Sequence, residues 1–163
     1  MLYRKTTQPG RRHAVGRCAA FILAALCIQN LAAEAVAQTD SPDDILVVAN
    51  NSVSASSVSL TVIRDLFLKI RKEWRAGENA TPVNAKDEQL RSDFRKRVLS
   101  MDLTAEQRHW EDVKVKFGQS EPPSFANNLK AVFKLKGAVS YLYRKDYKEG
   151  VAKVILVVPA KGN

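Results

Sequence analysis

The sequence predicts an α/β fold, a small three-layer domain whose mixed sheet is flanked by about four helices. Three observations favour this class. A continuous apolar strand near the start is followed directly by an amphipathic helix, further helices occupy the middle of the chain, and two apolar strands lie near its end. No internal repeat or low-complexity segment interrupts this order.

Residues 1–37 have the features of an export signal. Ala19 to Ala33 form an apolar run that is short for a membrane span, which needs about 20 residues. Ala35-Val36-Ala37 then supplies the small-x-small pattern at which signal peptidase cuts. The basic residues before the run are Arg4, Lys5, Arg11, Arg12 and Arg17. We expect a signal peptide cleaved after about Ala37 and a periplasmic protein, with an uncleaved anchor as the alternative.

Removal of this segment leaves residues 38–163, which are enough for one compact domain with a single core. Both cysteines, Cys18 and Cys27, leave with the signal, so the exported chain relies on no disulfide. The signal holds 5 of the 26 basic and 1 of the 17 acidic residues, so the formal net charge falls from +9 to +5. This balance favours anionic ligands or surfaces, although it also fits an ordinary solvated surface. Nucleic acid is not expected as a partner of an exported chain.

The first predicted strand is Ile45 to Ala49, a continuous apolar run of the kind that a buried central strand shows. A polar, serine-rich loop from Asn50 to Ser57 follows it. Ser59 then stands where a helix N-cap is expected. The apolar residues that recur on one face of this helix are Leu60, Ile63, Leu66, Phe67 and Ile70.

A basic segment follows this helix and surrounds Trp74. Its charged members are Lys69, Arg71, Lys72 and Arg75. Two interpretations stay open, namely a surface that binds a membrane or a polyanion, and a solvated helix end whose tryptophan packs inward. Residues 77–79 are expected to turn, and residues 81–84 to be extended because Pro82 disfavours helix in the residue before it.

Three more helices are predicted in the middle of the chain. The first runs from about Asp87 to Ser100 and buries Leu90, Phe94 and Val98. A capping box at Thr104 and Gln107 opens the second, which ends at Gly118 and buries Trp110, Val113 and Phe117. The third is capped by Ser124 and ends at Gly137, with apolar positions at Phe125, Leu129, Val132 and Phe133. Strands are then predicted over residues 138–143 and 151–158.

The order of these features carries a family resemblance. The residues concerned are Ser59-Leu60, Leu66-Phe67-Leu68, Trp74, Gly77, Pro82-Val83, Arg91, Phe94, Val98-Leu99 and the later Gly137-Ala138-Val139-Ser140-Tyr141-Leu142. In this order they resemble the phosphate-binding component of bacterial phosphate ABC transporters, which has a type 2 periplasmic-binding fold. The segment from Gly137 is similar to that family's Gly-Ala-Ile-Gly-Tyr strand entry.

The resemblance implies a periplasmic-binding-protein-like domain with a single lobe. Family members normally close two lobes over phosphate, whereas residues 38–163 suffice for about one. The chain is therefore similar to the compact members labelled phosphate transporter substrate-binding proteins. A lone lobe cannot bury a small anion by hinge closure, so it would need a second copy in a homodimer, a membrane transporter or sensor partner, or a shallower site.

The family's anion-binding side chains are replaced in this chain. Two-lobed relatives place an arginine, an aspartate and a Ser-Gly-Thr run before the second helix. Counting back from Phe94, these positions fall on Asn84, on Lys86 and on Glu88-Gln89-Leu90. A phosphate site would then depend on main-chain N–H groups with Asn84, Lys86, Gln89 and Arg91. The alternative is that Asp87 and Glu88 are ordinary first-turn residues of a helix.

A second candidate site is the loop after the first strand. Asn51 and Ser52 lie where open α/β sheets usually bind ligands, beyond the carboxyl end of a strand. We expect no enzyme, metal site or cofactor, because His109 is the one histidine outside the signal and no serine lies in a nucleophile elbow. The expected function is capture of phosphate or a related oxyanion for an ABC transporter. The alternative is a degenerate lobe that serves as an interaction or sensor-input module.

Overall fold

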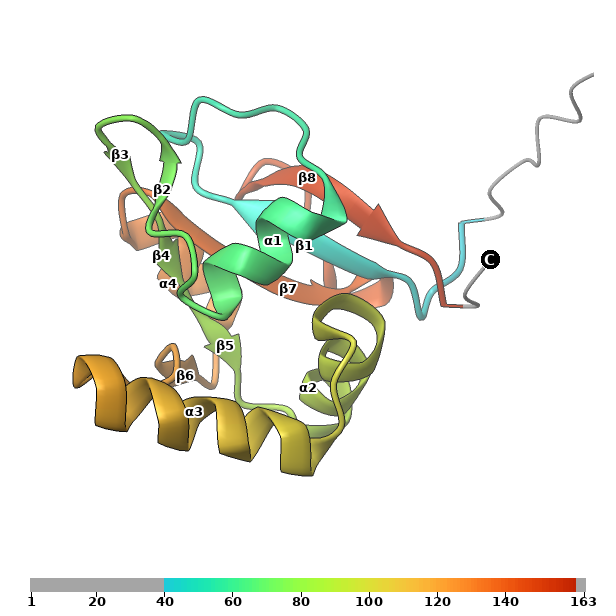
Figure 1. Ribbon diagram of the computed structural model, residues 1–163. Coiled ribbons are helices and arrows are strands. Elements are labelled where there is room, and N and C mark those ends of the chain that lie inside the picture. The colour runs from blue at the N-terminus through green and yellow to red at the C-terminus, as the bar shows by residue number, and fades with distance from the viewer. Residues whose placement is uncertain (1–39, 161–163) are drawn as a thin grey trace, which may run out of the picture. The chain divides into compact units, whose positions relative to one another are not determined.

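The computed structural model describes residues 40–160 (Figure 1). The predicted signal, residues 1–37, lies outside the described residues. The main sheet has four strands in the order β4-β7-β1-β8. Their bounds are Thr81–Pro82 for β4, Ala138–Tyr143 for β7, Ile45–Ala49 for β1 and Lys153–Val158 for β8. β1 is antiparallel to both of its neighbours and β4 is parallel to β7, so the predicted mixed sheet is confirmed.

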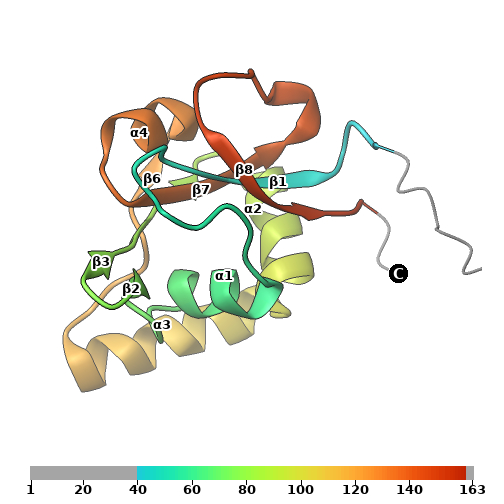
Figure 2. The same cartoon turned by 90° about the horizontal axis from the view of Figure 1, so that it is seen from above.

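β1 lies at the centre because both of its faces are apolar. All five of its residues are buried, and successive side chains point to opposite faces of the sheet. Ile45, Val47 and Ala49 contribute to one core cluster, and Leu46 and Val48 contribute to another. Helices cover each cluster, which gives the three layers that the sequence predicts (Figure 2).

The larger cluster lies under α1 (Leu60–Phe67) and α2 (Glu88–Phe94), and α2 continues as the π-helical turn η1 (Arg95–Leu99). The predicted cap of α1 is confirmed, since the Ser59 hydroxyl accepts from the Val62 N–H at 3.4 Å. Phe94 stacks on Tyr141 with ring centroids 3.7 Å apart, and Phe67 meets both rings edge-on. This aromatic trio fixes the two helices against β7. Two apolar residues that the sequence places on this helical face are not in the core: Leu60 is 38% exposed, and Ile70, which lies beyond the end of α1, is 67% exposed.

The smaller cluster lies under α4 (Asn128–Lys134), which starts later than the sequence predicts. Ser124 does not cap a helix. Together with Phe125 it forms strand β6, which runs parallel to β5 (Asn84–Ala85). The Asn127 side chain caps α4 instead, accepting from the Lys130 N–H at 2.8 Å. Pairing with β5 keeps Ser124 and Phe125 extended, and this explains the later start.

α3 (Leu103–Phe117) also differs from the prediction. It is capped by Asp102, whose carboxylate accepts from the Ala105 N–H at 2.7 Å, and not by the box at Thr104. Glu106 is its one buried residue, whereas Trp110 and Val113 are half-buried and Phe117 is 69% exposed. The helix lies along the edge of the molecule on the α1 side of the sheet (Figure 2). Its end at Gly118, with φ of 65°, is as predicted.

A small hairpin, β2 (Glu73–Arg75) and β3 (Glu78–Asn79), follows α1 and turns at Gly77. Trp74 is 6% exposed, and its indole N–H donates to the Gly137 carbonyl at 3.0 Å, which confirms the inward tryptophan. A short 3-10 turn, Arg144–Asp146, leads out of β7. Within residues 40–160, no helix has the length and apolar character that a membrane span requires.

Candidate functional site

The candidate site begins where β5 runs into α2. Asn84 is buried at this point, and its contacts are internal. Its backbone N–H donates to Pro123, its side-chain amide donates to Pro122, and its amide oxygen accepts from the Tyr141 hydroxyl. Asn84 therefore holds the proline connector against the sheet and positions the turn that follows.

Lys86 is the exposed cation of this turn. It lines a hollow of about 330 Å³ between the starts of α2 and α4. Polar side chains around this hollow include those of Asn127, Asn128, Lys148, Asp87 and Asp146. The Asp87 carboxylate is used by its own helix, since it accepts from the Leu90 N–H at 2.7 Å. The Asn128 amide is also engaged, since its N–H groups donate to the Ser140 hydroxyl and to the Tyr141 carbonyl. The Asn127 oxygen caps α4, which leaves the N–H groups of Asn127 and the two lysines as the donors around the hollow.

Tyr143 lies on the wall of the same hollow. Its hydroxyl donates to the Asp93 carboxylate at 2.8 Å. Burial, together with this bond to a carboxylate, raises the pKa of Tyr143 above its ordinary value. The phenol therefore stays neutral at physiological pH. Gln89 is exposed one helical turn before Asp93, and its amide donates to the other Asp93 oxygen at 3.3 Å.

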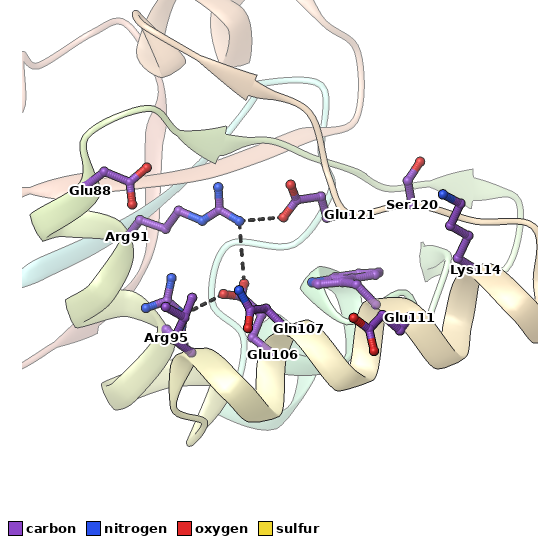
Figure 3. A pocket seen from close by; sticks show the side chains of 11 residues that line it. Glu88, Arg91, Arg95, Glu106, Gln107, Glu111, Lys114, Ser120 and Glu121 are labelled. Carbon is purple, nitrogen blue, oxygen red and sulfur yellow. Dashed lines mark hydrogen bonds and ion pairs between the residues drawn. The ribbon is translucent and has the colours of Figure 1, made fainter.

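Arg91 lines a different hollow, of about 580 Å³, between α2, α3 and the connector before β6 (Figure 3). Its guanidinium lies 2.5 Å from Glu121 and 3.8 Å from Glu106. Burial alone would lower the pKa of Arg91, but these two carboxylates outweigh it and raise the pKa. The charge of Arg91 is therefore largely compensated within the protein.

Arg95 and Glu106 form a buried ion pair beside Arg91, with 2.5 Å between their closest atoms and 8% exposure for each side chain. Two buried nitrogens of this region, Arg91 Nε and Trp110 Nε1, have no hydrogen-bond partner among residues 40–160. The sequence alone does not predict this network. The one sequence feature that points to the network is the four-residue spacing of Arg91 and Arg95, which places two cations on one face of a helix.

Asn51 and Ser52 lie in the loop after β1, and both are exposed. The Ser52 hydroxyl accepts from the Gly137 N–H at 3.2 Å, and its own N–H donates to Asn50 at 2.8 Å. Asn50 also donates to the Val132 carbonyl at 2.7 Å, so this asparagine organises the loop. Ser52 faces a hollow of about 630 Å³ that Arg75 and Lys136 also line.

The structure therefore distributes the predicted site residues over separate places. Lys86, Arg91 and Ser52 line three different hollows. Asn84 lies beneath the turn that bears Lys86, and Gln89 lies on the outer face of α2. Among residues 40–160, no group of three or more His, Cys, Asp or Glu side chains has a geometry that could hold a metal ion.

Comparison with solved structures identifies the class of fold. One similar structure, from Clostridium perfringens, is described as a phosphate ABC transporter substrate-binding protein with bound phosphate. It has a TM-score of 0.53 and 17% identity, over 69% of this chain and 44% of that one. Another is an ABC-type phosphate transport receptor from Vibrio cholerae, with a TM-score of 0.51 and 10% identity, over 71% of this chain and 47% of that one. No protein-family model and no curated protein matches the chain.

These comparisons confirm the fold that the sequence resemblance implies. The chain has the α/β architecture of phosphate ABC transporter substrate-binding proteins. The chain spans less than half the length of these two solved structures.

Proposed function

We propose that this protein is an exported, non-enzymatic solute-binding protein that captures phosphate or a related oxyanion for an ABC transporter in the periplasm. The observation that carries the proposal is the fold shared with a substrate-binding protein solved with bound phosphate. A mildly basic exported chain also suits an anionic ligand.

The turn from β5 into α2 is the place that we propose for the anion. Lys86 supplies an exposed positive charge there, and Lys148, Asn127 and Asn128 lie around the same hollow. The ammonium groups of the two lysines and the amide N–H groups of Asn127 are donors that suit phosphate oxygens, whereas the amide of Asn128 already donates to Ser140 and Tyr141. Asn84 contributes by fixing the turn, and Gln89 and Arg91 lie on the helix that follows. The loop with Asn51 and Ser52 is the second proposed place, where Ser52 lines a hollow together with Arg75 and Lys136.

Isothermal titration of residues 38–163 with phosphate, sulfate and a phosphonate tests this proposal. We expect heat of binding with at least one of them, and its loss in Lys86→Glu. The matched control is Lys96→Glu, which makes the same charge change on an exposed lysine at the far end of the same helical segment. Binding that survives Lys86→Glu, or that Lys96→Glu also abolishes, would place the anion elsewhere.

A second candidate function has an observation in its favour. Arg91 is engaged by two carboxylates and Asn84 by the proline connector, so two of the predicted ligand groups already have partners in the protein. A lobe of this kind would serve as an interaction or sensor-input module without a ligand. Absence of heat across the titration panel would support this second function over capture.

The proposed capture needs a second surface, because one lobe cannot close over an anion. We propose a membrane transporter or sensor as its source, with a second copy of the chain as the alternative. Light scattering after size exclusion, with and without phosphate, distinguishes them. A mass that doubles in phosphate would support the homodimer, and a constant monomer mass would leave the membrane partner.

A further inference from the structure

We propose that the protein docks on an anionic lipid surface through a face formed by the segment that follows α1 and the end of α3. This lipid-docking face consists of Lys69, Ile70, Lys72, Lys116 and Phe117. It lies apart from Lys86 and Ser52, so it goes beyond the proposed capture of an oxyanion.

The apolar part of the face is unusually exposed. Ile70 and Phe117 are 67% and 69% exposed, and both line one hollow of about 410 Å³ between the segment after α1 and helix α3. Large apolar side chains gathered in this way on a solvated surface mark a site of interaction.

The charged part of the face is positive. Lys69 and Lys72 line the hollow together with His109, and none of the lining residues is a carboxylate among the residues that the structure describes. Lys69 is held in place, since its ammonium donates to the Ser120 carbonyl at 2.6 Å. Lys116 lies beside Phe117 and makes only a long 3.7 Å contact with the exposed Asp112. An acidic surface would therefore meet little local repulsion.

Lipid fits this arrangement better than a protein partner does. Ile70 and Phe117 protrude from two separate segments, and a protein would need a matched pocket for each. The boundary between lipid headgroups and acyl chains accepts scattered apolar side chains without such pockets. Anionic headgroups attract each nearby lysine, and these attractions add. The face therefore has the two components of interfacial binding.

Vesicle co-sedimentation of residues 38–163 tests the proposal. This segment contains both core clusters in full, so it carries the complete core of the domain. We expect binding to vesicles of equal parts phosphatidylglycerol and phosphatidylcholine, and none to pure phosphatidylcholine. Raising NaCl from about 0.1 M to about 0.5 M should release the protein, because salt screens the lysines.

Two variants examine the two components of the face. Lys72→Gln with Lys116→Gln should lower the partition coefficient about thirtyfold, from the loss of two charges near the surface. Ile70→Ser with Phe117→Ser should lower it at least about tenfold by removing the inserted side chains. All four positions are outside the core, so unchanged melting temperatures should accompany the loss.

The matched control is Lys130→Gln with Lys134→Gln on α4, beside the 59% exposed Phe133. This face is similarly basic and apolar but lies on the other side of the sheet (Figure 2). It should bind vesicles like the parent chain. An equal loss of vesicle binding in this control would show that binding depends only on net charge, and it would overturn the proposal. Absence of binding of the parent chain to anionic vesicles would also overturn the proposal. A protein would then be the expected partner of this face.

Discussion

The Arg95–Glu106 pair shows how single residues attach α3 to the rest of the domain. Each side chain is 8% exposed, and the pair joins η1 to the one buried position of α3. Removing one partner would leave the other charge buried without its close counter-ion. Arg91, at 3.8 Å from Glu106, compensates for only part of this.

We therefore expect Arg95→Met to lower the free energy of unfolding by about 3 kcal/mol. Replacing both partners, as Arg95→Met with Glu106→Leu, should restore most of that loss, because no unpaired charge then remains. Urea unfolding of the three proteins measures the coupling. Equal losses in the single and the double variant would show that the pair is not the main link to α3.

Position 137 requires glycine because the backbone of Asn79 lies close to it. Its φ is 74°, and a Cβ there would lie 2.3 Å from the Asn79 carbonyl oxygen. Gly150 has a similar φ of 82° with nothing within 4 Å, so it is a matched control. Gly150→Ala should cost about 1 kcal/mol from backbone conformation alone. Gly137→Ala should cost at least about 2 kcal/mol, because the hairpin that holds Trp74 must also move. Equal changes in thermal unfolding would contradict the close approach.

At the scale of elements, the start of α3 depends on Asp102. The helix buries little of its own surface, so its first turn relies strongly on the cap. Asp102→Ala should lower stability by about 1 kcal/mol and speed amide hydrogen exchange in residues 103–108. Thr104→Ala, which changes the residue that the sequence predicts as the cap, should have less than about half that effect. A larger loss of stability in Thr104→Ala than in Asp102→Ala would contradict this assignment and support the predicted capping box.

The elements that the sequence predicts well are those whose burial follows from their own residues. β1 is apolar throughout, and α1 and α2 present Ile63, Leu66, Leu90 and Phe94 at helical spacing. α3 also has apolar residues at helical spacing, yet it is mostly exposed. Periodicity shows which residues share a face but not whether another element covers that face. The same limit applies to the candidate site. The position of Lys86 at the start of a helix could be predicted from neighbouring residues, whereas the ion-pair partners of Arg91, Glu106 and Glu121, are distant in sequence and could not.

At the scale of the whole molecule, Asp44 ties three strand ends together. Its carboxylate accepts from the N–H groups of Ser41 and Ala160 at 3.0 and 2.9 Å and lies 3.3 Å from Arg144. These residues flank β1, β8 and β7. Burial alone would raise the pKa of Asp44, but the two backbone N–H groups and Arg144 together lower it below 3.8.

This lowered pKa predicts a pH dependence of stability. The folded state holds the proton of Asp44 less tightly than the unfolded state does. The contribution of Asp44 is therefore complete above the unfolded value, near pH 4, and is lost as pH falls through the folded pKa. The stability difference between the parent chain and Asp44→Asn should be constant above about pH 5 and shrink below about pH 4. A difference that grows on acidification in urea unfolding would contradict this assignment.

The central claim is that a single lobe of a phosphate-binding fold holds an oxyanion at the turn from β5 into α2. Its most direct test is a phosphate titration of residues 38–163, followed by amide chemical shifts in NMR. The account predicts saturable shifts concentrated at residues 85–89 and at Asn127 and Asn128. Shifts confined to residues 50–52, or none at millimolar phosphate, would contradict it.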